Sequence, residues 1–304
     1  MSYPPVLLIG GSGFVGRSVT TRLVERGYPV IIPTRLLPRP HQNSRTPQIQ
    51  WVEGSVHEPQ FLESLCHQIG PAGTVINLVG LLHDKPAKPY GLQFKAAHVD
   101  LVQMILDSMK ARGVRRILHM SALGADRTGP SMYQRSKGEG EQRVRTSNLD
   151  WTIFRPSVIF GAHDNFINLF SKLARRFPVL PLTCATARFQ PVSVENVAEA
   201  LVRSLAMPQT LGQSYDLAGP EILTLAELVQ FAARRTGHTR LIVSLPAWLG
   251  TLQALMFEAL PGPMLMSRDN LASMRLDNVL PPGAPLTLGT VFGIQPETLD
   301  SLLK

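Results

Sequence analysis

The first half of this 304-residue sequence alternates short, continuous apolar runs with segments of helical periodicity. Continuous apolar runs are typical of strands that are buried on both faces of a parallel sheet. Because parallel strands are joined by right-handed helical crossovers, helices must cover both faces of that sheet. The sequence therefore predicts a doubly wound α/β domain. The expected strands are 6–9, 30–32, 49–52, 74–79, 116–120 and 151–155. The first main helix is expected to end near residue 26, and two further helices are expected over 92–112 and 131–147.

The second half has a less regular pattern, with helical periodicity over 165–177, 194–205 and 225–235 and a late strand over 214–217. We expect a first domain of residues 1–160, to which the chain returns at about 187–220. Residues 161–186 and 221–304 are then expected to form a smaller lobe. A cleft is expected between the two parts, at the carboxyl ends of the strands.

A glycine-rich turn follows the first expected strand and opens the first helix. Its glycines at 10, 13 and 16 suit a tight turn, a close approach of the backbone to a pyrophosphate, and close packing of helix on strand. Phosphates bind well to the free N–H groups at such a helix N-terminus. A purely structural turn is the alternative. The expected nucleotide-binding residues of this turn are Gly10, Gly11, Ser12, Gly13, Phe14, Val15 and Gly16.

The end of the second expected strand indicates which nucleotide is bound. An acidic residue usually stands there in NAD sites, whereas this chain has Thr34 followed by Arg35. The Arg35 guanidinium suits a charge-assisted contact with a 2′-phosphate, and Arg17 and Arg39 are placed to assist. We therefore expect Thr34 and Arg35 to contact NADP. NAD stays open as the alternative cofactor, as does Arg35 as a plain surface residue.

Tyr133 and Lys137 are one helical turn apart, between the fifth and sixth expected strands. In a cofactor cleft, the Lys137 ammonium is expected to lower the pKa of the Tyr133 phenol and to hydrogen-bond the nicotinamide ribose. The phenol then serves as a general acid or base on a hydroxyl or carbonyl group.

Composition excludes several other classes of protein. The 30 basic and 22 acidic residues give a formal charge of +8, but no long basic run predicts nucleic-acid binding. The two cysteines, Cys66 and Cys184, fit neither a disulfide framework nor a metal site, so we expect no metal. The N-terminus does not resemble a signal peptide. We expect a cytoplasmic protein, with a peripheral position at the inner membrane left open.

These motifs together resemble the short-chain dehydrogenase/reductase superfamily, in its extended or atypical branch, over roughly residues 4–220. The resemblance implies a Rossmann fold and places Leu78, Val79, Gly80 and Pro156 at the nucleotide, with Ser121 beside Tyr133 and Lys137. The segments 30–35, 155–168 and 190–194 are similar to the nucleotide-binding accessory subunit of respiratory complex I and its bacterial relatives. That similarity implies a respiratory-complex or membrane-surface partner.

Three positions depart from the pattern of active extended members. Leu123 stands where a Ser or Thr hydroxyl normally holds the substrate oxygen, and Ser121 lies two residues earlier. His98 stands where Asn is common, and Ser55 replaces an Asp that faces the adenine. Loss of one such hydrogen-bond donor typically lowers the rate by about 10²–10³.

Apolar residues fill one arc of a helix expected over 248–260, including Trp248, Leu252, Leu255 and Met256. We expect this helix to be mostly buried between the lobes. The alternative is a surface that faces a lipid, a quinone-like substrate or a partner protein.

Three functions therefore compete. The first is NADP(H) binding by a protein of the complex I accessory-subunit type, with weak or absent oxidoreductase activity. The second is an active NAD(P)-dependent oxidoreductase, epimerase or dehydratase that acts on a hydroxyl or ketone through Tyr133 and Lys137. The third is a redox sensor that binds NADP(H) and regulates a protein partner. Leu123 favours the first and third, and the Tyr–Lys pair favours the second.

Overall fold

Seven parallel strands form one sheet in the order β11-β6-β5-β4-β1-β2-β3. The computed structural model describes residues 3–37, 47–259 and 266–303. The strand order reverses between β1 and β4, which is where doubly wound sheets bind their ligands. The doubly wound prediction is therefore confirmed. The strands are β1 (Val6–Ile9), β2 (Val30–Thr34), β3 (Ile49–Glu53), β4 (Thr74–Asn77), β5 (Arg116–Met120), β6 (Asp150–Pro156) and β11 (Gln213–Leu217).

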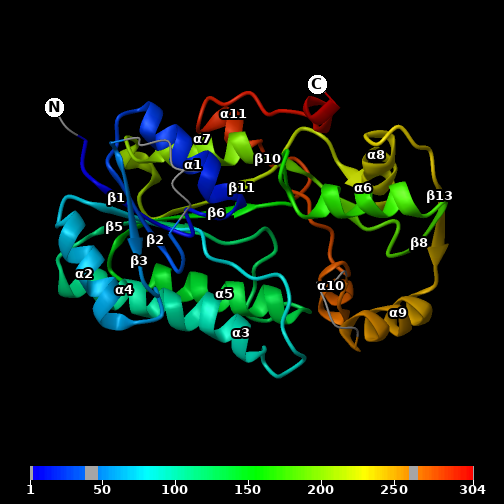
Figure 1. Cartoon of the computed structure of the whole chain (residues 1–304), viewed down its shortest axis with the longest axis horizontal. Helices are drawn as coiled ribbons and strands as arrows, with labels where there is room; N and C mark the ends of the chain where they lie inside the picture. The colour runs from blue at the N-terminus through cyan, green and yellow to red at the C-terminus, as the bar shows by residue number, and fades with distance from the viewer. Residues whose placement is uncertain (1–2, 38–46, 260–265, 304) are drawn as a thin grey trace.

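Helices cover both faces of this sheet (Figure 1). Within β1, Val6 and Leu8 pack into one apolar cluster while Leu7 and Ile9 pack into the other, so each strand is buried on both sides. One face carries α1 (Phe14–Glu25), α7 (Val194–Ser204) and α11 (Thr287–Thr290). The other carries α2 (Pro59–Ile69), α3 (Leu92–Phe94), the π-helix η1 (Lys95–Asp100), α4 (Leu101–Ala111) and α5 (Met132–Arg145).

A third apolar cluster forms the core of a smaller group of elements beside the sheet (Figure 1). It is built mainly from α6 and α8, which pack against each other and against short strand pairs. These elements are β7 (Ile159–Phe160), α6 (Phe166–Arg176), β8 (Val179–Thr183), β9 (Arg188–Phe189), β10 (Val192–Ser193), β12 (Leu223–Thr224), α8 (Leu225–Arg234), β13 (Leu241–Leu245), α9 (Ala247–Ala259), α10 (Arg268–Ser273) and η3 (Leu299–Leu303). The short helix η2 (Pro208–Thr210) instead packs on β11 of the large sheet.

The C-terminal segment returns to the large sheet. Leu288, Phe292 and Ile294 are buried in the apolar cluster of α1 and α7, although the sequence placed this segment in the smaller lobe. Phe292 also packs against Phe154 of β6 and Tyr215 of β11. The large core therefore includes residues from both ends of the chain.

The expectation that α9 is mostly buried is wrong. Trp248 is 68% exposed and Leu252 is 51% exposed, whereas Ala254 is fully buried. The helix packs on β8 and α10 through its small residues, because Gly250 lies directly against Thr183 of β8. Small side chains permit this close approach, and the large apolar side chains then face outward. No helix among the described residues is long and apolar enough to cross a membrane.

Candidate nucleotide site

The glycine turn joins β1 to α1 in a conformation that leaves the N-terminus of the helix open. Gly10 has a φ of +89°, which L-residues with a side chain rarely adopt. Gly13 is the N-cap of α1, and no side chain caps this terminus. A Cβ atom added at Gly13 would meet only the carbonyl oxygen of Gly10, at 3.2 Å. The open helix end, which carries no acidic residue in its first turn, therefore suits an anion.

Two other glycines of the turn have a packing role. A Cβ at Gly16 would lie 2.2 Å from the carbonyl oxygen of Gly10, so helix and strand touch at this point. A Cβ at Gly11 would lie 2.8 Å from the side chain of Ile32 on β2. The Gly16 contact is the close packing that the spacing predicts for the last glycine of such a turn, whereas the Gly11 contact was not predicted.

The loop after β4 borders the glycine turn, because a Cβ at Gly10 would lie 3.3 Å from Leu78 and from the nitrogen of Val79. Asn77 shapes this loop by accepting a hydrogen bond from the Val79 N–H at 3.1 Å. That bond turns the chain, which explains why the strand ends at Asn77 rather than at residue 79 as expected. The Asn77 amide in turn donates to Nδ1 of His119 on β5, at 3.3 Å.

Lys137 reaches from α5 to the carboxyl end of the sheet. Its Nζ donates to the carbonyl of Met120, the last residue of β5, at 3.1 Å. A Cβ at Gly80 would lie 3.2 Å from the same nitrogen, so the ammonium is placed between β5 and the loop after β4. Burial lowers the pKa of Lys137 to about 8, and the nearby Glu141 carboxylate opposes that shift.

Tyr133 lies one turn before Lys137 and packs edge-on against Phe94 and His98. Burial raises the pKa of the Tyr133 phenol to about 12. This direction is opposite to the lowering by Lys137 that the sequence predicts, because burial is the dominant cause of the shift in the Tyr133 pKa. A phenol with this pKa stays protonated at neutral pH, which suits it to donate a proton.

The N-terminus of α5 is held by an unusually complete set of acceptors. Ser131 and Gln134 form a capping box, in which the Ser131 hydroxyl accepts from the Gln134 N–H. Asp269 of α10 accepts from the Met132 N–H at 2.6 Å and from the Tyr133 N–H at 3.1 Å. The Asp269 carboxylate is buried, and no local sequence pattern predicts that this distant residue contacts the helix.

His98 lies in the π-helix η1, and π segments often occur at functional sites. Its Nε2 accepts from the Leu81 N–H at 3.0 Å, so the ring proton is on Nδ1, which lies 2.8 Å from the Ser136 hydroxyl. Ser136 in turn donates to the carbonyl of Tyr133. Burial, together with the charges of Lys137 and His119, lowers the pKa of His98 to about 2. A neutral histidine therefore links the loop after β4 to the helix of Tyr133.

Two buried polar atoms near the end of β5 have no hydrogen-bond partner among the described residues. They are the Ser121 hydroxyl and Nε2 of His119. Since Asn77 donates to Nδ1 of His119, the ring proton is on Nε2. Buried polar groups normally find partners, so these two atoms indicate a place for a bound polar group. His119 was not among the expected site residues.

The position of Leu123 is fixed through its backbone. Its N–H donates to the carbonyl of Pro156, the last residue of β6, and its carbonyl accepts from the Asn278 amide. Ser55, a second position that departs from the family pattern, accepts a hydrogen bond through its hydroxyl from the His57 N–H, shortly before α2 begins.

The adenosine end of the expected site carries positive charge that forms no ion pair among the described residues. Arg35 directly follows β2 and is exposed, and Arg17 is exposed in the first turn of α1. The hydroxyl of Thr34 bonds locally to the Leu36 carbonyl. Glu53 of β3 lies opposite Thr34 in the sheet, an acidic neighbour that the sequence analysis missed. Arg39 lies outside the described residues.

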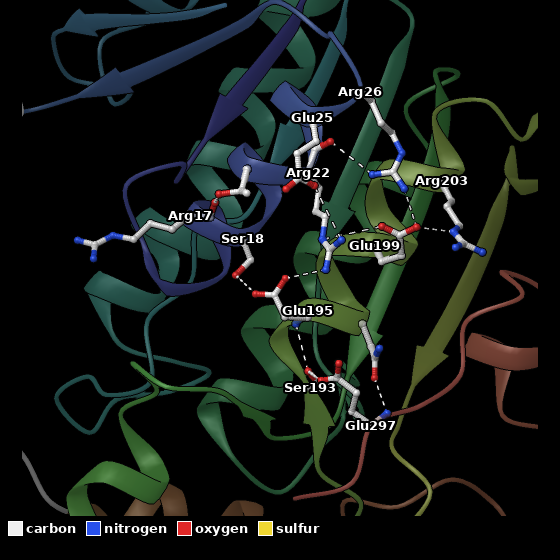
Figure 2. Close-up of polar contacts among 12 residues, drawn as sticks. Arg17, Ser18, Arg22, Glu25, Arg26, Ser193, Glu195, Glu199, Arg203 and Glu297 are labelled. Carbon is white, nitrogen blue, oxygen red and sulfur yellow. Dashed lines mark hydrogen bonds and ion pairs between the residues drawn. The ribbon is translucent and has the colours of Figure 1, made fainter. Parts of the chain in front are cut away.

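A network of ion pairs fixes α1 against α7 (Figure 2). Arg22 pairs with Glu195 at 3.1 Å, and Arg26 pairs with Glu199 at 2.6 Å. Burial raises the pKa of Glu199, but hydrogen bonds from Arg203 and Arg26 outweigh it and lower the pKa overall. Figure 2 shows the Arg17 side chain pointing away from this network. Arg17 is therefore the arginine of α1 that stays available at the glycine turn.

No group of three or more His, Cys, Asp or Glu side chains in the described part of the chain is arranged to hold a metal ion. The site instead combines an open helix N-terminus, a Tyr–Lys pair and unpartnered polar atoms. Residues 6–218 match the NAD dependent epimerase/dehydratase family. The chain belongs to this family. The resemblance to extended short-chain dehydrogenases is thereby confirmed, as is the Rossmann-type fold.

Comparison with individual proteins refines this placement. The chain is 29% identical to the mouse (Mus musculus) NADH dehydrogenase [ubiquinone] 1 alpha subcomplex subunit 9, mitochondrial, over 96% of this chain and 77% of the relative. It is also 29% identical to the ceramide reductase of Caulobacter vibrioides, over 77% of this chain and 66% of the relative. A nucleoside-diphosphate-sugar epimerase structure from Staphylococcus aureus shares the fold, with a TM-score of 0.73, 16% identity, and 98% and 99% coverage of the two chains. The similarity to the complex I accessory subunit is confirmed.

Proposed function

We propose that the protein binds NADP(H) as an accessory protein of the complex I subunit type and has weak or absent oxidoreductase activity. The observation that carries this proposal is the uncapped N-terminus of α1, which is open above Gly13 and lies at the point where the strand order reverses. The proposed nucleotide contacts are Gly10, Gly11, Ser12, Gly13, Phe14, Val15, Gly16, Thr34, Arg35, Leu78, Val79, Gly80, Tyr133, Lys137 and Pro156.

The choice of NADP over NAD depends on the charges at the end of β2. Arg35 and Arg17 are both exposed, and neither forms an ion pair among the described residues, so both are available to a 2′-phosphate. Glu53, opposite Thr34, is the carboxylate that would favour a ribose hydroxyl instead. We propose that the two guanidinium groups outweigh this single exposed carboxylate.

Weak or absent turnover is proposed from the groups around Tyr133. Leu123 supplies no hydroxyl, and the Ser121 hydroxyl is the nearest candidate in sequence. If Ser121 reaches the substrate, the protein is an active oxidoreductase or epimerase that uses Tyr133 as the acid and Lys137 to hold the ribose. The unpartnered Ser121 hydroxyl favours this second candidate. A redox sensor that binds NADP(H) and regulates a partner is the third.

A partner surface is proposed on the smaller lobe, residues 161–186 and 221–304, apart from the segment that packs on the sheet. The outward face of α9 exposes Trp248, Leu252, Leu255 and Met256. Contiguous apolar surface of this kind usually marks an interaction site. Since the mouse relative is a subunit of NADH dehydrogenase, a respiratory complex or the adjoining membrane surface is the proposed partner, with a cytoplasmic location at the inner membrane.

The nucleotide that co-purifies with the protein, identified by mass, tests the first part of this proposal. NADP or NADPH is the expected result, and a protein that retains neither form and shows no affinity for them would overturn it. Oxidation of NADPH in the presence of carbonyl substrates then separates the candidates. Turnover that disappears in both Tyr133→Phe and Ser121→Ala would favour the active enzyme.

A further inference from the structure

An apolar cavity lies in the smaller lobe, between α6, β8 and α9. Its volume is about 230 Å³. The lining is almost entirely apolar and includes Leu169, Phe170, Leu173, Val179 and Met266, with Gln253 of α9 as the polar exception. None of the residues assigned above to the nucleotide line it. Sites for drug-sized molecules usually have about 300–1,000 Å³, so this cavity fits a slim ligand rather than a bulky one.

Two cations of α6, Lys172 and Arg176, are close in sequence to residues that line the cavity. Arg176 directly precedes Phe177 and follows Leu173 by three residues, and both of these neighbours line the cavity. Lys172 is four residues before Arg176, so the two cations share one side of α6. Both are exposed, and neither forms an ion pair among the residues that the structure describes. A ligand with an apolar body and an anionic end matches both the apolar lining and these two cations.

We propose that this cavity binds one fatty acyl chain, with the anionic head group of the molecule held by Arg176 and Lys172. The apolar lining favours the chain because its burial removes hydrocarbon from water. The two unpaired cations distinguish an anionic amphiphile from a neutral one. The occupant is a single molecule taken from solution, and the exposed face of α9 is a separate surface because Trp248 and Leu252 do not line the cavity.

The cavity is connected to the Tyr133 site through α10. Met266 lines the cavity, Ser267 caps α10, and Asp269 in its first turn accepts from the Tyr133 N–H. In Figure 1, α10 lies between α5 and α9. An acyl chain against Met266 therefore contacts the segment that holds the N-terminus of α5. The acyl-chain cavity and the proposed nucleotide contacts have no residue in common, so binding at each site can be measured separately.

Isothermal titration calorimetry of the full protein with decanoate as the acidic probe, kept below its micellar concentration, tests the proposal. We expect saturable binding of one probe molecule per chain. Gln253→Trp fills the cavity from the half-buried side of α9 and should weaken binding by about tenfold or more. Val179→Trp, at an exposed rim position, is a second blocking variant, and thermal melting of both confirms that they are folded.

Three controls separate the occupant from its alternatives. Leu252→Gln, on the outward face of α9, should leave probe affinity unchanged. The double variant Lys172→Ala, Arg176→Ala should weaken the acidic probe about three- to tenfold while leaving the corresponding uncharged amide unchanged. Absence of saturable binding, equal affinity in the parent and both blocking variants, or binding to anionic vesicles alone would overturn the proposal. NADPH titration of the same variants reports the nucleotide site independently.

Discussion

Asp269 and Tyr133 are joined by a hydrogen bond of 3.1 Å from the Tyr133 N–H to the carboxylate, across 136 residues of sequence. The second carboxylate oxygen accepts from the Met132 N–H. Two N–H groups at a helix N-terminus are therefore satisfied by one buried side chain of another element. The orientation of the Tyr133 helix depends on a residue that no local sequence pattern identifies.

Asp269→Asn should reduce the free energy of unfolding by about 1–3 kcal/mol, because the amide accepts from only one of the two N–H groups and loses the charge. Asp300→Asn is the matched control, since Asp300 is exposed and forms no ion pair among the described residues. Urea unfolding of both variants gives the comparison. Equal stabilities would show that the Asp269 bonds are dispensable.

Gly13→Val should lose nucleotide affinity, whereas Gly16→Val should lose stability. Gly13 has an ordinary φ of −75° and its Cβ position is open, so the valine variant should fold but lose nucleotide affinity by at least about a hundredfold. At Gly16 a Cβ would overlap the Gly10 carbonyl oxygen, so that variant should be destabilised. Circular dichroism and NADPH fluorescence measure the two effects. Undiminished NADPH affinity in folded Gly13→Val would move the site elsewhere.

Arg35→Ala should weaken NADPH binding by about ten- to a hundredfold and leave NADH nearly unchanged, because a charge-assisted phosphate contact contributes about 1.5–3 kcal/mol. Arg234→Ala removes an equivalent exposed charge from α8 as the control. Glu53→Gln should leave NADPH affinity equal or higher. If the parent binds both nucleotides equally, or if Glu53→Gln selectively weakens NADH, the NADP assignment is wrong.

His98 should make the protein sensitive to acid. Its pKa in the folded protein is about 2, against about 6.5 in the unfolded chain. Below pH 6.5 the unfolded chain binds a proton that the folded protein does not bind, so the free energy of unfolding falls as the pH falls. One such histidine contributes a slope of about 1.4 kcal/mol per pH unit. His98→Asn should reduce the measured slope between pH 4 and 6 by about this amount. An unchanged slope in this variant would contradict the assignment.

Leu252→Asp and Ala254→Asp test the two sides of α9. Leu252 faces outward, so its aspartate variant should stay within about 0.5 kcal/mol of the parent stability and lose affinity for anionic vesicles. Ala254 is fully buried, so an unpaired charge there should unfold the chain or destabilise it by several kcal/mol. Melting curves and vesicle sedimentation give the two readouts. If Leu252→Asp unfolds, the face of α9 that carries Leu252 must be buried in the protein after all.

The sequence predicted the large sheet well, because its strands are continuous apolar runs and its glycine turn has a fixed geometry. Strand 116–120 was predicted to the residue, and 151–155 falls within β6. The short strands of the smaller lobe escaped prediction. Strands β7, β9, β10 and β12 have two residues each, which is too few for a periodic pattern.

The neighbours within the candidate site could be predicted only where the residues are close in sequence. The pair Tyr133 and Lys137 shares one helix, so its spacing was visible. Asp269, His119 and Glu53 were missed because each acquires its neighbours through the tertiary fold. The exposure of α9 was misjudged for a related reason. An apolar arc shows that a helix has an apolar face. In α9, however, the small residues Gly250 and Ala254 determine which side packs closely against the rest of the protein.

The return of Leu288, Phe292 and Ile294 to the cluster that contains Val6 and Leu8 has a consequence for biosynthesis. During translation the first strand emerges long before the residues that complete the core beneath it. The dinucleotide-binding half therefore cannot reach its final packing until almost 300 residues have been made. Its apolar face stays incompletely covered for that interval, when aggregation is the main hazard. We expect released chains that are truncated before residue 288 to need a chaperone, whereas released chains that include residue 294 do not.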